Sequence, residues 1–144
     1  MMVKSQKTLS TALFFLFFML IIPPLSQVAF PQSKPERLPK EIAKIRLPKL
    51  IDFGANKCIP CKKMAPILQE LTEEYKGRVV IKIIEVYQEQ ELTRVNGIRL
   101  IPTQIFFDDK NQEIYRHVGF MDKEQIKKVF EKMGVHPVRK PSTS

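Results

Sequence analysis

Apolar runs in the middle and C-terminal parts of the chain predict four strands. Residues 50–53 form a short apolar run that one aspartate interrupts, which is typical of a buried strand. Residues 79–86 are mostly β-branched and give the clearest strand signal. Residues 103–107 and 113–118 flank a polar turn, so we expect them to pair as a hairpin.

Helices are predicted between and after these strands by apolar residues that recur every three or four positions. One helix begins near Pro60 and should end at Gly77, and Pro66 should kink it because proline removes a backbone hydrogen bond. A short helix is expected at 88–95, and Asp122 should cap the last helix. The order strand, helix, strand, helix, strand, strand, helix predicts an α/β fold with a mixed sheet and helices on both faces.

The N-terminal residues follow another pattern. Two lysines and no acid precede an apolar run at 12–22, which two prolines end. A basic start followed by about 7–15 apolar residues is the layout of a secretory signal, and the run is short for a membrane span, which needs about 20. Residues 1–29 are therefore predicted to be a signal peptide or, if uncleaved, an N-terminal membrane anchor. Either way, we expect the rest of the chain outside the cytoplasm, in the periplasm or secreted, or held at the inner membrane by this segment.

The net charge of +9 lies mostly outside the expected domain. Residues 51–136 carry 14 lysines and arginines against 13 aspartates and glutamates. Residues 30–48 are rich in proline and basic residues and are predicted to be a linker, with a short helix at 40–46. The folded domain is expected at 49–136 and a flexible basic tail at 137–144. A nucleic-acid-binding protein concentrates its charge on its folded face, so no nucleic-acid partner is expected; attraction of the linker to anionic lipid is the alternative.

Two cysteines, Cys58 and Cys61, mark the expected junction between the first strand and the first long helix. Unpaired N–H groups and the positive end of the helix dipole favour a thiolate at Cys58. Lys57 and Lys62 add positive charge, and Pro60 suits the first helical turn. Cys61, one turn further, should be more buried and less acidic. We predict that Cys58 attacks a substrate disulfide and that Cys61 resolves the mixed disulfide.

The surrounding residues resemble those of the thioredoxin family. Asp-Phe-Gly-Ala-Asn-Lys-Cys-Ile-Pro-Cys-Lys at 52–62, followed by Met-Ala-Pro-Ile-Leu at 64–68, is similar to the active-site strand and helix of thioredoxins. Ile-Pro-Thr at 101–103 matches a family segment whose proline is cis and faces the active site. Gly119 matches a glycine that leaves room beside it. The resemblance spans about 49–133 and implies a thioredoxin-like fold with four or five strands, because the family's first strand and helix have no clear counterpart here.

The resemblance also implies roles for individual residues. Asp52, six positions before Cys58, matches a buried acid that can exchange a proton with Cys61. Pro102, if cis, would hold a backbone edge at Ile101 for pairing with a substrate strand. The alternatives are an aspartate bonded only to local backbone and an ordinary trans proline. The residues expected to meet substrate are Ile101, Pro102, Lys57, Ile59 and Pro60, and those expected to shape the site are Pro66 and Gly119.

Two departures from the family bear on function. Lys57 replaces the usual tryptophan, and Ile59 stands where cytoplasmic thioredoxins have glycine. An apolar residue followed by proline between the cysteines is closer to membrane-tethered reductases outside the cytoplasm than to strong oxidants. We therefore expect an extracytoplasmic reductase of protein disulfides that receives electrons from a membrane protein.

Three other functions remain open on the sequence. A disulfide oxidase or isomerase would use the same two cysteines. A metal-binding module would hold zinc or copper through Cys58 and Cys61, with His117 or His136 as further ligands, although structural zinc usually needs two close ligand pairs. A thioredoxin-like adaptor would leave the cysteine pair unused. No glycine-rich nucleotide loop is present, so we expect a monomer that needs no cofactor and no metal.

Overall fold

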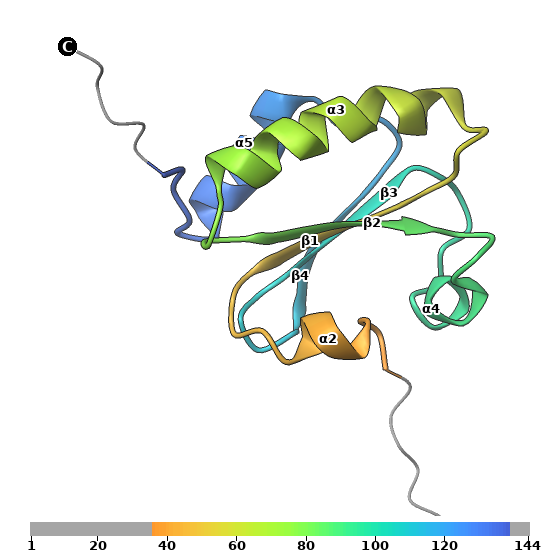
Figure 1. The fold of residues 1–144 in the computed structure, drawn as a ribbon, viewed down its shortest axis with the longest axis horizontal. Coiled ribbons are helices and arrows are strands. Elements are labelled where there is room, and N and C mark those ends of the chain that lie inside the picture. Colours follow the sequence, from red (N-terminus) through yellow and green to blue (C-terminus); the bar gives the residue numbers. More distant parts are fainter. Residues whose placement is uncertain (1–35, 139–144) are drawn as a thin grey trace, which may run out of the picture. The chain divides into compact units, whose positions relative to one another are not determined.

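The computed structural model describes residues 36–138 (Figure 1). The predicted signal or anchor at 1–29, and most of the predicted basic tail, lie outside these residues. Between residues 36 and 138, no helix has the length and apolar character needed to cross a membrane.

A mixed four-stranded sheet forms the centre of the fold. Its strands are β1 (Lys49–Gly54), β2 (Val80–Glu85), β3 (Thr103–Phe107) and β4 (Glu113–Val118), in the order β2-β1-β3-β4. β1 pairs with β2 in parallel and with β3 antiparallel, and β3 pairs antiparallel with β4. The predicted mixed sheet is thus confirmed, with four strands.

Helices cover both faces of this sheet, as predicted (Figure 1). α3 (Ile59–Glu74) and α5 (Lys123–Lys132) lie on one face, while α2 (Lys40–Ala43) and α4 (Gln90–Val95) lie on the other. Asp122 caps α5, because its side chain accepts from the backbone N–H of Gln125 at 2.8 Å while the Gln125 side chain accepts from the N–H of Asp122 at 2.9 Å.

Two apolar clusters pack against opposite faces of the central strands, because alternate residues of a strand point to opposite sides. Every residue of β1 and β3 is buried. Leu50 and Phe106 face α3 and α5 and pack with Met64, Leu68 and Phe130. The other cluster includes Leu38, Ile42, Ile51, Phe53, Ile105 and Phe107. By the same alternation Asp52 lies on the α3 face, which sets its place in the site described below.

The segment predicted to be a linker differs from that expectation over its second half. Leu38 is 3% exposed and Ile42 is 8% exposed, and both belong to the core on the α2 face. Arg37 donates to the Asn96 side chain at 3.1 Å, and Asn96 donates back to the Arg37 carbonyl at 2.8 Å. The linker prediction was based on the prolines and basic residues of this stretch and overlooked these two apolar side chains, which lie four positions apart. Residues 36–48 are therefore part of the folded unit.

The fully buried Lys49 also holds residues 36–48 against the fold. Its Nζ donates to the carbonyls of Ile45 at 2.8 Å and Leu47 at 2.6 Å. A buried ammonium is costly unless it is hydrogen-bonded. These bonds therefore fix the chain just before β1.

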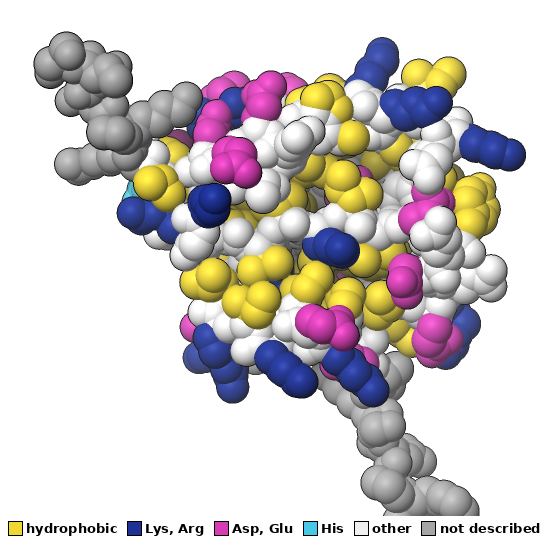
Figure 2. Space-filling view, viewed as in Figure 1, with side chains coloured by type: hydrophobic (Ala, Val, Ile, Leu, Met, Phe, Trp, Pro, Cys, Tyr) yellow, Lys and Arg dark blue, Asp and Glu magenta, His cyan; other side chains and the backbone are white. Residues whose placement is uncertain are grey.

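Charged side chains are mixed on the surface. On the face drawn in Figure 2, lysines and arginines are scattered among acids around the rim, and hydrophobic side chains lie between them. This face has no single basic patch of the kind that a nucleic-acid-binding surface displays.

Candidate active site

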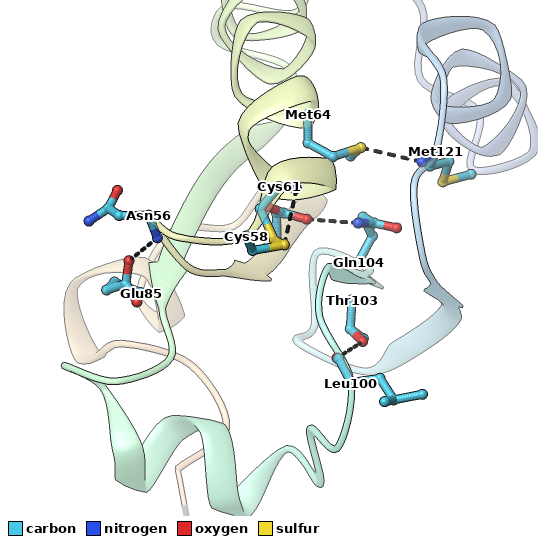
Figure 3. The surroundings of a disulfide bond; sticks show 10 residues. Asn56, Cys58, Cys61, Met64, Glu85, Leu100, Thr103, Gln104 and Met121 are labelled. Atoms are coloured by element: carbon cyan, nitrogen blue, oxygen red, sulfur yellow. Dashed lines mark hydrogen bonds between the residues drawn. A yellow bond between two sulfur atoms is a disulfide. The ribbon is translucent and has the colours of Figure 1, made fainter.

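Cys58 and Cys61 lie where the loop after β1 enters α3 (Figure 3). Cys58 is the N-cap of the helix, and its Sγ accepts from the backbone N–H of Cys61 at 3.2 Å. The two sulfur atoms form a disulfide, with the Cα atoms 5.2 Å apart. Cys61 is 8% exposed and Cys58 is more exposed. The predicted order of burial is therefore observed.

The surroundings of Cys58 favour negative charge on its sulfur. α3 has 16 residues, and its first turn contains no acid. When the disulfide is open, the Cys61 N–H and the positive end of the helix dipole remain directed at this sulfur. Lys57 and Lys62 are both exposed on either side of the pair. This arrangement stabilises a thiolate, which is the nucleophilic form of cysteine.

Asp52 is buried on the face of the sheet that α3 covers. It is 1% exposed and stands directly opposite Gln104 in the β1–β3 register. Gln104 Nε2 donates to Asp52 Oδ1 at 2.8 Å (Figure 3). Burial raises the pKa of Asp52 to about 6, and the hydrogen bond from Gln104 opposes that rise. Asp52 is bonded to a side chain on another strand, so the local-backbone alternative does not describe it.

Gly54 allows the helix start and the buried acid to approach each other. A Cβ at this position would lie 3.2 Å from Cys61 Cβ, 3.4 Å from Cys61 Sγ and 3.5 Å from Asp52 Oδ2. Asp52, Gly54 and Cys61 line one pocket of about 130 Å³, together with Lys62 and Glu85. Because each water occupies about 30 Å³ in the liquid, this pocket is large enough for a few waters between Asp52 and the surface.

The peptide bond between Ile101 and Pro102 is cis, as the resemblance implied. Ile101 and Cys58 pack against the same apolar cluster, and Leu100 and Thr103, on either side of this peptide bond, lie in the surroundings of the disulfide (Figure 3). Gly119 N–H donates to the Pro102 carbonyl at 2.8 Å and ties the loop to the end of β4. Gly119 has φ +107°, a backbone conformation that favours glycine, and the space beside it is open. The positive φ therefore explains why glycine stands here, since an added Cβ would meet no other atom.

Exposed apolar side chains accompany the site. Ile59 is 71% exposed and Leu100, just before the cis loop, is 67% exposed. Tyr87 is 70% exposed and lines a second surface pocket of about 490 Å³ with Lys57 and Glu85. Pro60 and Pro66 are both exposed, Pro60 in the first turn of α3 and Pro66 further along the helix. Pro66 does not line the Asp52 pocket.

Two residues of the site were missed by the sequence analysis, Gln104 and Glu85. A glutamine among the apolar residues of 103–107 was the available signal for Gln104. Glu85 ends β2, accepts from the Asn56 N–H at 2.8 Å, and has a buried Oε1 with no hydrogen-bond partner within the described residues.

The histidines lie away from any ligand cluster. His117 Nε2 is 3.2 Å from the Phe120 carbonyl, and His136 is exposed beyond α5. Over residues 36–138, no three His, Cys, Asp or Glu side chains gather where they could hold a metal ion.

Comparisons with known proteins agree with the geometry. The family model described as thioredoxin matches residues 30–132. The thioredoxin of Pseudomonas aeruginosa is 33% identical over 87 residues, which cover 60% of this chain and 80% of that protein. The thioredoxin of Staphylococcus aureus is 37% identical over 83 residues, which cover 58% of this chain and 79% of that protein.

Proposed function

We propose that this chain, which belongs to the thioredoxin family and is a thiol–disulfide oxidoreductase, reduces protein disulfides outside the cytoplasm. The observation that carries the proposal is the N-cap position of Cys58, where a backbone N–H is already directed at its sulfur. The reacting pair, the acid and the cis loop each have a role in two successive steps.

In the first step, the Cys58 thiolate attacks one sulfur of a substrate disulfide. The substrate S–S bond breaks, a Cys58–substrate disulfide forms, and the departing substrate thiolate takes up a proton. The helix start stabilises the attacking thiolate before the reaction.

In the second step, Cys61 loses its proton and its sulfur attacks Cys58 Sγ. The Cys58–Cys61 disulfide forms, and the second substrate thiolate leaves and takes up a proton. Asp52 is the acceptor that we assign to the Cys61 proton, because both side chains line one pocket and Oδ2 of Asp52 approaches Gly54 from the same side as Cys61. The substrate has then gained two electrons and two protons.

A substrate strand is expected to align along the cis loop. Ile101 lies two residues before β3, and among residues 36–138 no backbone hydrogen bond engages it, so its backbone groups can pair with an extended peptide. The exposed side chains of Lys57, Ile59 and Pro60 lie at the helix start where this peptide would pass.

The direction and the location are inferred from the sequence. Ile59-Pro60 between the cysteines favours a reductase, and the apolar run at 12–22 favours export. The two electrons consumed in each turnover are then supplied by a membrane protein that carries its own reduced dithiol. We expect the chain to act as a monomer.

The reduction potential of the Cys58–Cys61 couple tests this proposal. The folded chain is equilibrated in graded thiol–disulfide buffers, and the fraction of disulfide is measured. A potential below about −230 mV supports a reductase, and one above about −150 mV shows that the chain donates disulfides instead. Absence of a reversible two-electron couple would overturn the redox assignment and favour the metal-binding or adaptor alternatives. Export is tested separately, by locating the full chain in cell fractions.

A further inference from the structure

We propose that Gln104 is a positioning residue of the second step. Its side-chain amide holds the Asp52 carboxylate under Cys61 and sets the pH range in which Asp52 accepts the Cys61 proton. This inference rests on the proposed function and deepens it.

The geometry places Gln104 to act through Asp52 alone. The two residues are direct partners in the antiparallel β1–β3 pair, so their side chains lie on the same face. Gln104 is 0% exposed and Asp52 is 1% exposed, and 2.8 Å separates the donor nitrogen from the acceptor oxygen. Within residues 36–138, this is the one side-chain hydrogen bond that the Asp52 carboxylate accepts. Figure 3 shows the Gln104 side chain extending toward the cysteine pair, with a dashed line that begins at its amide nitrogen.

Folding alone does not explain a glutamine at this position. The next three residues of β3, at 105–107, are fully buried and apolar. Gln104 Oε1 is buried with no hydrogen-bond partner in the described chain. An unpartnered buried polar atom destabilises a fold, and an apolar side chain of similar size avoids that cost. The amide is therefore retained for what its nitrogen does at Asp52.

The amide can serve both protonation states of the acid. The ionised carboxylate accepts from Nε2, as observed. Once Asp52 has taken the proton from Cys61, its O–H can donate to Oε1 after the amide turns over about its last torsion, because one end of the amide donates and the other accepts. Asp52 thus has a hydrogen-bond partner on the neighbouring strand β3 in both protonation states.

The remaining groups around Asp52 offer it no comparable bond. The other ionisable side chains that line the Asp52 pocket are Cys61 and Lys62 from α3 and Glu85 from β2, and His117 stands opposite Gln104 on β4. Burial raises the pKa of Asp52, and only the Gln104 hydrogen bond lowers it. Removing that bond should therefore raise the pKa of Asp52 further, so that less of the base is available below neutral pH.

The test uses the full chain carrying Gln104→Leu, an apolar replacement of similar length that removes both amide atoms. The Asp52 carboxyl is titrated by NMR in the disulfide form, where the cysteines do not ionise. Reduction of insulin disulfides by the dithiol form is then measured in single turnovers across pH. We expect the Asp52 midpoint and the acidic limb of the rate profile to move up together by about one pH unit, with about fivefold slower turnover near pH 6.

Two further variants separate a positioning role from a structural one. Gln69→Leu, the same change at an exposed position of α3, should leave both profiles unchanged. In an Asp52→Asn chain, adding Gln104→Leu should move the rate profile no further. If Asp52→Asn alters the profile but Gln104→Leu moves neither the midpoint nor the rate, the role of Gln104 is refuted and the proposed function stands. If the unaltered chain shows no dithiol–disulfide exchange, the proposed function itself fails.

Discussion

Replacing Asp52 by asparagine should make the folded protein more stable at neutral pH. The pKa of this carboxyl rises from its ordinary value of 3.8 to about 6 on folding, because it is buried. The difference is about two pH units, and at 1.36 kcal/mol per unit the buried charge costs about 3 kcal/mol. Asparagine is nearly the same size, keeps a hydrogen-bond partner in Gln104 and carries no charge.

The pH dependence of this effect has a definite sign. Below about pH 3.8 the carboxyl is protonated in both the folded and the unfolded chain, so the aspartate costs nothing. Between pH 3.8 and about 6 the folded chain binds more protons than the unfolded chain, so its stability falls as the pH rises. Above about pH 6 the cost is complete. The advantage of the variant should therefore appear as the pH rises through this interval and then level off.

Urea unfolding of the disulfide form measures the effect, with the free energy of unfolding extrapolated to water at several pH values. Glu73→Gln is the control, because it neutralises an exposed carboxylate and should change stability by less than about 0.5 kcal/mol. A variant that is less stable than the parent, or a difference that stays constant from about pH 4 to pH 8, would refute the reasoning that burial makes this charge costly.

Three further predictions concern the site and its support. Cys61→Ser should accumulate a covalent Cys58–substrate disulfide, visible by mass spectrometry without reductant, whereas rapid release of the substrate would argue against its resolving role. Gly54→Ala should lower the free energy of unfolding in urea by about 1–3 kcal/mol and slow turnover, because the new methyl would crowd Cys61. Unchanged stability and turnover would show that the start of α3 can shift to accommodate the methyl. Leu38→Ala should lower the free energy of unfolding by about 2–5 kcal/mol, because it removes a buried side chain. Ile45 is 39% exposed, and Ile45→Ala should lower it by less than about 0.5 kcal/mol. Equal effects of the two substitutions would show that Leu38 is not part of the core.

Local sequence signals predicted most of the secondary structure. The strands at Thr103–Phe107 and Glu113–Val118 have the predicted bounds, because a polar turn separates two runs of strand-forming residues. Asp122 caps the last helix as predicted, because capping depends on residues only three positions apart. Burial was harder to foresee. The β-branched run around β2 gave the clearest strand signal, yet it forms an edge of the sheet where Ile83 is 45% exposed.

The site residues within one sequence motif could be predicted. Those that only the fold brings together could not. Cys58, Cys61 and the acid at 52 lie within a short stretch of one motif. Gln104 is 52 positions from Asp52, and only the register of two antiparallel strands makes them neighbours. A pattern read along the chain carries no information on that register until the strands have been paired.

The buried lysine at the start of β1 offers a way to observe the chain opening. Lys49 Nζ is enclosed by the carbonyls that precede it, whereas Lys57 and Lys62 face solvent. An amine-reactive label should therefore modify the two exposed lysines at once. It should reach Lys49 only when residues 36–48 detach, even though burial lowers the pKa of Lys49 and so favours its reactive neutral form. The rate at which Lys49 is labelled would thus measure how often this segment leaves the sheet, independently of any change at the cysteines.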